Sequence, residues 1–102
     1  EHQKARDAFF EVTKMANQET QTGRAHLAEA FNGIAVACKA MKQNDEALRA
    51  NMRLIIFFDK ENSYVPQAYR DAIEILEGRG PKEQEKAQAL REEYNAKYEQ
   101  QP

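Results

Sequence analysis

Three groups of residues in this sequence could take part in chemistry. His26 and Glu29 lie three residues apart, which places both on one face of a helix, where they could share a metal ion. Cys38 is the single cysteine, and a thiolate can act as a nucleophile. The segment 78–82, Gly-Arg-Gly-Pro-Lys, combines glycines with a lysine, as phosphate-binding loops do.

None of these groups meets the requirements of a reactive centre. A zinc site takes three or four protein ligands, whereas His26 and Glu29 supply two, and His2 is remote near the start of the chain. Cys38 has no histidine near it in sequence and belongs to an apolar helical stripe, which favours a buried, inert thiol. The segment 78–82 lacks the glycine spacing and preceding strand of a phosphate cradle and is typical of a turn. We therefore expect no enzyme activity, no metal and no cofactor, and we assign no catalytic residue.

Composition narrows the class of protein and its partners. A chain of 102 residues is enough for one domain. Its 15 basic and 17 acidic residues are interspersed and give a net charge of -2, so we expect no nucleic-acid partner. The longest aliphatic and aromatic run, Leu-Ile-Ile-Phe-Phe at 54–58, is far short of the ~20 apolar residues of a spanning helix, so we expect no membrane insertion.

Helix-favouring residues dominate and strand-favouring residues are scarce, which predicts an all-α fold. Apolar residues recur at three- and four-residue spacing along five segments separated by polar or glycine-containing turns. The first predicted helix covers roughly 3–19, the stripes of the next three run over 27–41, 47–58 and 68–76, and the last helix covers about 82–98.

Polar residues, proline and glycine mark where these helices begin and end. Thr22 is a suitable N-cap for the second helix, as are Asn44 or Asp45 for the third, because their side-chain oxygens can accept from free N–H groups. Pro66 fits the first turn of the fourth helix, and a glycine of 78–81 can take a left-handed conformation to close it. Short turns favour antiparallel neighbours, either in a bundle or in a stack of hairpins.

Two series of similar residues recur at about 40 residues, which indicates a repeat of two helices. In one series an alanine opens the similar segments 5–9, 47–51 and 87–91. In the other, an aromatic residue followed by apolar residues at helical spacing occurs at 31–38 and again at 69–76.

These residues resemble the tetratricopeptide repeat, in which the first helix carries an aromatic residue, Leu-Gly and Tyr, and the second carries Ala-x3-Phe. Phe31 stands for the aromatic residue, 34–35 for Leu-Gly and Cys38 for the tyrosine. Ala47 stands for the alanine of the second helix, at the family's own spacing from Phe31. Small residues at 35 and 47 would let the two helices of a hairpin approach closely.

The chain also departs from the family pattern. Asn51 and Arg91 replace the aromatic residue of the second helix, and Ala35 and Ile73 replace the glycine. Each repeat is longer than the ~34 residues of the standard unit. The elongated hairpins are similar to the divergent repeats of bacterial envelope proteins, such as outer-membrane assembly lipoproteins and the Tol-Pal cell-division coordinator, which points to the periplasm or cell envelope.

The resemblance implies one domain over 1–102, a short right-handed solenoid of about five helices in stacked antiparallel hairpins. Residues 1–20 would be the second helix of a partial repeat, 22–63 the first full hairpin and 64–99 the second. First helices of such hairpins line a concave surface, so we expect a protein–protein interaction scaffold that binds a peptide or protein there. The residues expected in that groove are Asn32, Val36, Lys39, Arg70, Glu74 and Glu77.

The same residues are also compatible with alternatives to a binding groove. The charged groove residues would suit an ordinary solvated helix face. The run 54–58 puts apolar surface on every side of a helix, which either packs against the fourth helix or forms an interface. In the latter case the chain is an oligomerisation module, a homo-oligomer held through Ile55, Phe57 and Phe58. A further alternative is a non-catalytic subdomain of a larger enzyme.

Overall fold

Five α-helices follow one another along the chain. The computed structural model describes residues 1–17, 19–60 and 63–99. The elements are α1 (His2–Met15), α2 (Gln21–Ala40), α3 (Asn44–Phe57), α4 (Val65–Gly78), the 3-10 turn η1 (Pro81–Glu83) and α5 (Gln84–Tyr98). These ranges contain no strand, which confirms the predicted all-α class with five helices. Parts of the predicted segments 1–20, 22–63 and 1–102 fall on 18, 61–62 and 100–102, outside the described residues.

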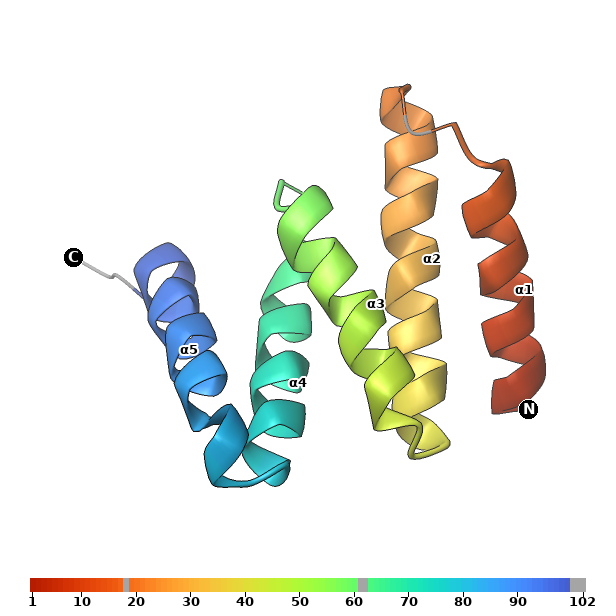
Figure 1. Cartoon of the computed structure of the whole chain (residues 1–102). Helices are drawn as coiled ribbons and strands as arrows, with labels where there is room; N and C mark the ends of the chain where they lie inside the picture. The colour runs from red at the N-terminus through yellow and green to blue at the C-terminus, as the bar shows by residue number, and fades with distance from the viewer. Residues whose placement is uncertain (18, 61–62, 100–102) are drawn as a thin grey trace.

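The helices pack in the order in which they occur in the sequence, each mainly against the one before and the one after it. In Figure 1 the chain reverses direction at each connection, and α1 and α5 lie at opposite ends of the molecule. The molecule is 36 by 33 Å across and 18 Å deep. The first and last helices therefore do not meet to close a bundle.

Two helix starts differ from the predicted caps. The N-cap of α2 is Thr20, whose side-chain oxygen accepts from the backbone N–H of Gly23 at 2.9 Å, and the predicted Thr22 lies inside the helix. The Thr20 hydroxyl also donates to the carbonyl of Asn17, which fixes the earlier start. Asn44 belongs to the first turn of α3, and the residue before it makes no side-chain cap bond. Acidic residues in that turn stabilise the helix start through its dipole instead.

The boundaries of α4 follow the sequence prediction. Pro66 lies in the first turn, where its missing N–H needs no partner. After the helix ends, Gly80 has a φ of 95°, a conformation that side chains with a Cβ rarely adopt. Gly80 therefore turns the chain from α4 into η1.

Alanines fill the contacts between the central helices. Ala35 of α2 and Ala47 of α3 are both buried in one apolar cluster with Cys38. Ala68 and Ala72 of α4 are buried in a second cluster that extends to α5. Side chains this small let the helices approach closely, as the sequence predicted for positions 35 and 47.

The first helix is attached through a ring that lies on a glycine. No residue of α1 is fully buried, and Phe9 is one of its half-buried members. The Phe9 ring covers Gly33 of α2 so closely that a Cβ added there would lie 2.4 Å from the ring carbons. The absence of a side chain at Gly33 therefore sets how closely α1 packs on α2.

Three tyrosines join α4 to α5. The ring of Tyr69 is fully buried and lies 6.1 Å from the ring of Tyr94 and 6.0 Å from that of Tyr98, centroid to centroid. Its hydroxyl donates to the Glu93 carboxylate at 3.0 Å and accepts from the Lys97 ammonium at 3.1 Å. Burial is the main cause that raises the pKa of Tyr69 above its ordinary 10.0. The hydrogen bond to Tyr69 is the main cause that raises the pKa of Lys97 above 10.5.

The packing of α1 can be tested by adding one methyl group at Gly33. Gly33→Ala should lower the free energy of unfolding by about 1–3 kcal/mol, because the Phe9 ring must move away. Gly78→Ala is the matched control, since nothing lies within 4 Å of the added Cβ, and it should be neutral or stabilise by up to ~1 kcal/mol. Urea denaturation followed by circular dichroism measures both changes. A Gly33 variant as stable as the wild type would contradict the contact.

The buried hydroxyl of Tyr69 makes stability depend on alkaline pH. Because the fold favours the neutral phenol, the unfolded chain ionises first, and the free energy of unfolding should fall as pH rises above 10.0. The raised pKa of Lys97 acts in the same direction above 10.5, where the unfolded chain loses the ammonium proton first. Tyr69→Phe should cost about 1 kcal/mol at neutral pH and flatten this alkaline slope. Denaturation of the wild type and of the Tyr69 variant across an alkaline pH series measures the difference.

Candidate functional site

The six residues predicted to line a groove lie on the parts of α2 and α4 that face away from the core, and we call this surface the α2–α4 face. Its members are Asn32, Val36, Lys39, Arg70, Glu74 and Glu77. The Lys39 ammonium lies 3.0 Å from the carboxylate of Asp71 and 2.8 Å from that of Glu74. These ion pairs link α2 to α4 through the long Lys39 side chain, although the helices are not consecutive.

Lys39 has a structural task in addition to its place on that face. Asp71 is 9% exposed and accepts hydrogen bonds from Lys39 and from Gln67, the latter at 2.8 Å. The hydrogen bond to Glu74, followed by that to Asp71, raises the pKa of Lys39 above its ordinary 10.5. Lys39 therefore neutralises a nearly buried carboxylate between the two helices.

The remaining members of the α2–α4 face divide into two kinds. Arg70 donates to the Tyr94 hydroxyl at 2.8 Å, and Glu77 forms an ion pair with Arg91, so both contact α5. Asn32 is half-buried, and Val36 is 54% exposed, which is unusual for a valine. The structure thus ties the charged members to neighbouring helices and leaves Val36 as the exposed apolar member.

The apolar run 54–58 is divided between core and surface. Ile55 and Phe58 are buried in the cluster shared with α4, so they are not available to a partner as the oligomer alternative requires. Phe57 is 59% exposed and Ile56 is 60% exposed. Helical geometry explains most of the split, because residues 54 and 55 fall on the core side of α3 and residues 56 and 57 on the other, and Phe58 follows the end of the helix and turns into the core.

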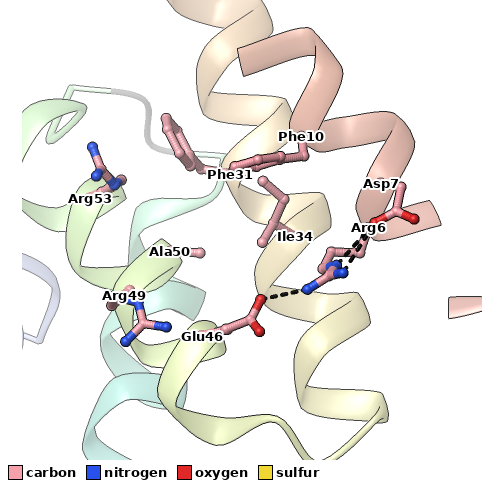
Figure 2. Close-up of a pocket in the computed structure, with 9 residues that line it drawn as sticks. All are labelled: Arg6, Asp7, Phe10, Phe31, Ile34, Glu46, Arg49, Ala50 and Arg53. Carbon is pink, nitrogen blue, oxygen red and sulfur yellow. Dashed lines mark hydrogen bonds and ion pairs between the residues drawn. The ribbon is translucent and has the colours of Figure 1, made fainter. Parts of the chain in front are cut away.

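A hollow of about 310 Å³ lies between α1 and α3, with α2 beneath it, and we call it the α1–α3 crevice. Figure 2 shows the side chains of α1 and α3 on opposite sides, with Phe31 and Ile34 of α2 between them. Ile34 and Ala50 are buried and Phe31 is half-buried, so these residues form an apolar floor. The crevice is lined by Arg6, Asp7, Phe10, Phe31, Ile34, Glu46, Arg49, Ala50 and Arg53.

One ion pair crosses the crevice at one end. The Arg6 guanidinium lies 2.7 Å from the Glu46 carboxylate and 3.2 Å from that of Asp7 (Figure 2). The hydrogen bond to Glu46 is the main cause that raises the pKa of Arg6. The α3 wall carries Glu46 and, further along the helix, Arg49 and Arg53, one turn apart. The Arg53 guanidinium lies 5.6 Å from the centroid of the Phe31 ring, so two positive charges stand above the apolar floor beyond Glu46.

None of the crevice residues was predicted as a site residue from the sequence. The sequence identifies Phe31 only as the aromatic residue of a repeat. The spacing of Arg49 and Arg53 shows that they share a helix face, but it does not show that α1 stands opposite. That placement depends on how α1 crosses α2, which the contact of Phe9 with Gly33 determines.

Of the residues that first suggested chemistry, Cys38 is buried, whereas His26 and Glu29 lie on the exposed surface of α2. Cys38 is fully buried with its sulfur 3.8 Å from the Glu46 carboxylate, and burial, followed by that negative charge, raises the pKa of the thiol. The protonated thiol is a poor nucleophile. His26 and Glu29 are exposed on α2, and in the part of the chain that the structure describes, no three histidine, cysteine or acidic side chains gather as a metal site would require. Within the same ranges, no helix has the length and apolar content needed to cross a bilayer.

Comparisons with known proteins identify no relative. No protein-family model, curated protein or solved structure matches this chain significantly. Its function is therefore inferred from the two surfaces described above, the α2–α4 face and the α1–α3 crevice.

The structural task of Lys39 can be separated from a binding task by stability measurements. Lys39→Met should lower the free energy of unfolding by about 1–3 kcal/mol, because the nearly buried Asp71 carboxylate loses its cation. Glu74→Gln removes the other, exposed partner of Lys39 and should change stability by less than ~0.5 kcal/mol. Thermal and urea denaturation of the two variants test this difference, and equal losses would show that Asp71 does not need Lys39.

Proposed function

We propose that this chain is a non-catalytic scaffold that binds another protein through the α2–α4 face, in a short stack of antiparallel hairpins like those of the tetratricopeptide repeat. One observation carries the proposal: α2 and α4 are joined directly by the ion pairs of Lys39 with Asp71 and Glu74. In a stack of two-helix repeats the first helices of successive hairpins are neighbours, and α2 and α4 are the helices to which the repeat pattern assigns that role.

The shape of the molecule supports the same function. A layer 18 Å deep, with its first and last helices at opposite ends, exposes much of its surface on two broad sides. Extended surfaces of this kind are used by helical repeat proteins to hold partners without chemistry. On the α2–α4 face, Val36 supplies exposed apolar area and Asn32 supplies an amide that can donate and accept. Contacts with a partner would therefore centre on α2.

The oligomerisation alternative is weaker on the same structure. With Ile55 and Phe58 in the core, only Phe57 and its neighbour Ile56 are exposed from the apolar run. A stable interface buries roughly 800 Å² on each partner, spread over about 20 residues or more. Two side chains provide a small part of that area, so the proposed function does not depend on self-association.

Substitutions at Val36 and Asn32 test the proposed face. We expect Val36→Glu combined with Asn32→Ala to reduce the amount of partner recovered from a native extract by about tenfold or more, because central contacts dominate binding energy. The measurement is quantitative mass spectrometry of proteins enriched by the tagged chain. Lys60→Glu together with Gln88→Ala is the control, since both residues are exposed and neither belongs to this face. Unchanged recovery by the Val36 and Asn32 variant would refute the assignment.

A further inference from the structure

Two arginines of the α1–α3 crevice stand apart from every other arginine in the described ranges. The guanidiniums of Arg6, Arg24, Arg70, Arg79 and Arg91 each bond to a carboxylate, a hydroxyl or a backbone carbonyl. Arg49 and Arg53 make no hydrogen bond or ion pair within those ranges. As far as these ranges show, their charges face water or a ligand.

The surroundings of these two charges are apolar. Phe10 is 52% exposed at the edge of the crevice, and Phe31 and Ile34 form its floor. Arg53 lies over the ring of Phe31, a position that holds the guanidinium next to the floor. Exposed aromatic surface beside cations that have no ion-pair partner in the described ranges suits a ligand that has both an apolar group and anionic groups.

The charge distribution selects the class of ligand. Two guanidiniums one helical turn apart can each pair with a carboxylate, and arginine binds carboxylates in a bidentate geometry. A nucleic acid presents a continuous row of phosphates, which would also meet the carboxylates of Asp7 on α1 and Glu46 on α3. A short acidic segment can place its charges on Arg49 and Arg53 alone, away from the end of the crevice where Arg6 pairs with Glu46. The hollow of about 310 Å³ is in the range that a large apolar side chain with its flanking backbone can occupy.

We propose that the α1–α3 crevice binds an acidic peptide segment of a partner protein. An aromatic or large aliphatic side chain of the segment lies on Phe31 and Ile34 beside Phe10, and its carboxylates pair with Arg49 and Arg53. This site is separate from the α2–α4 face, because Ile34 is two residues from both Asn32 and Val36 and so lies about 200° around α2 from Asn32. The proposal therefore does not depend on the proposed function.

Fluorescence anisotropy with synthetic peptides tests the class of ligand. The acidic probe is a labelled peptide with a central phenylalanine flanked on both sides by aspartate and glutamate. The matched control, the amide probe, has asparagine in place of aspartate and glutamine in place of glutamate. The acidic probe should bind about tenfold or more tightly than the amide probe, and its binding should weaken as salt is added. A third probe replaces the phenylalanine of the acidic peptide by serine and should also bind more weakly, because the apolar contact is lost.

Charge-matched variants locate the site. Arg49→Gln with Arg53→Gln should weaken binding of the acidic probe by about tenfold or more. Lys4→Gln with Lys82→Gln removes the same charge from exposed residues that do not line the crevice and should keep the affinity within about twofold. Arg49 and Arg53 are exposed, so the double variant should keep the helical circular dichroism and melting temperature of the wild type. The single Arg53→Gln variant provides the same comparison with less change in charge.

Several results would overturn the proposal. Equal binding of the acidic and amide probes would remove the role of the carboxylates. An equal loss in the Lys4 and Lys82 variant would show that attraction is non-specific. Tighter binding of a single-stranded oligonucleotide or of a phosphopeptide with the same apolar residue would assign the crevice to a different ligand.

Discussion

Close approach of helix backbones through alanine is the constraint on which the other features depend. Ala28 and Ala35 on α2, Ala47 on α3 and Ala72 on α4 are almost inaccessible to solvent. With such small side chains at the crossings, the helices pack closely and the molecule stays thin. Some larger side chains, such as the half-buried Phe31, lie at the margins of these contacts and become part of a surface, whereas others, such as Tyr69, are enclosed in the core. The core and the candidate sites are therefore consequences of the same packing.

Most of the charged side chains described above form ion pairs or hydrogen bonds with other residues of the chain. Lys39 joins α2 to α4, Arg6 joins α1 to α3 through Glu46, and the pair of Glu77 with Arg91 joins α4 to α5. The pairs of Arg6 and of Arg91 are partly exposed and contribute little to the free energy of folding, whereas the pair of Lys39 with the nearly buried Asp71 contributes more. Their larger effect is to fix neighbouring faces in register and to satisfy most guanidiniums locally. Against that background, a guanidinium without an anionic partner in the described ranges becomes informative about binding.

The sequence predicted those features that depend on local spacing. Apolar periodicity located five helices, and the small residues at 35 and 47 predicted a close contact that the buried cluster confirms. The predicted cap of α2 was wrong by two residues because Thr20 and Thr22 have the same capping chemistry, and only the hydrogen bonds of the Thr20 side chain with Gly23 and Asn17 distinguish them. The crevice could not be predicted, because it needs residues of α1 and α3 to face each other across α2. No periodicity within one helix contains that information.

Helix α2 contributes residues to both candidate surfaces, so partners on either surface would contact the same helix. One side of this helix presents Asn32 and Val36, and the opposite side supplies Phe31 and Ile34 to the crevice. Ligands on the two sides would contact the same helix without touching each other, because the buried layer lies between them. Neither surface closes on its ligand, so little rearrangement is needed for both to be occupied. A chain that binds two partners in this way would act as an adaptor, since it would hold them on opposite sides of a layer 18 Å deep.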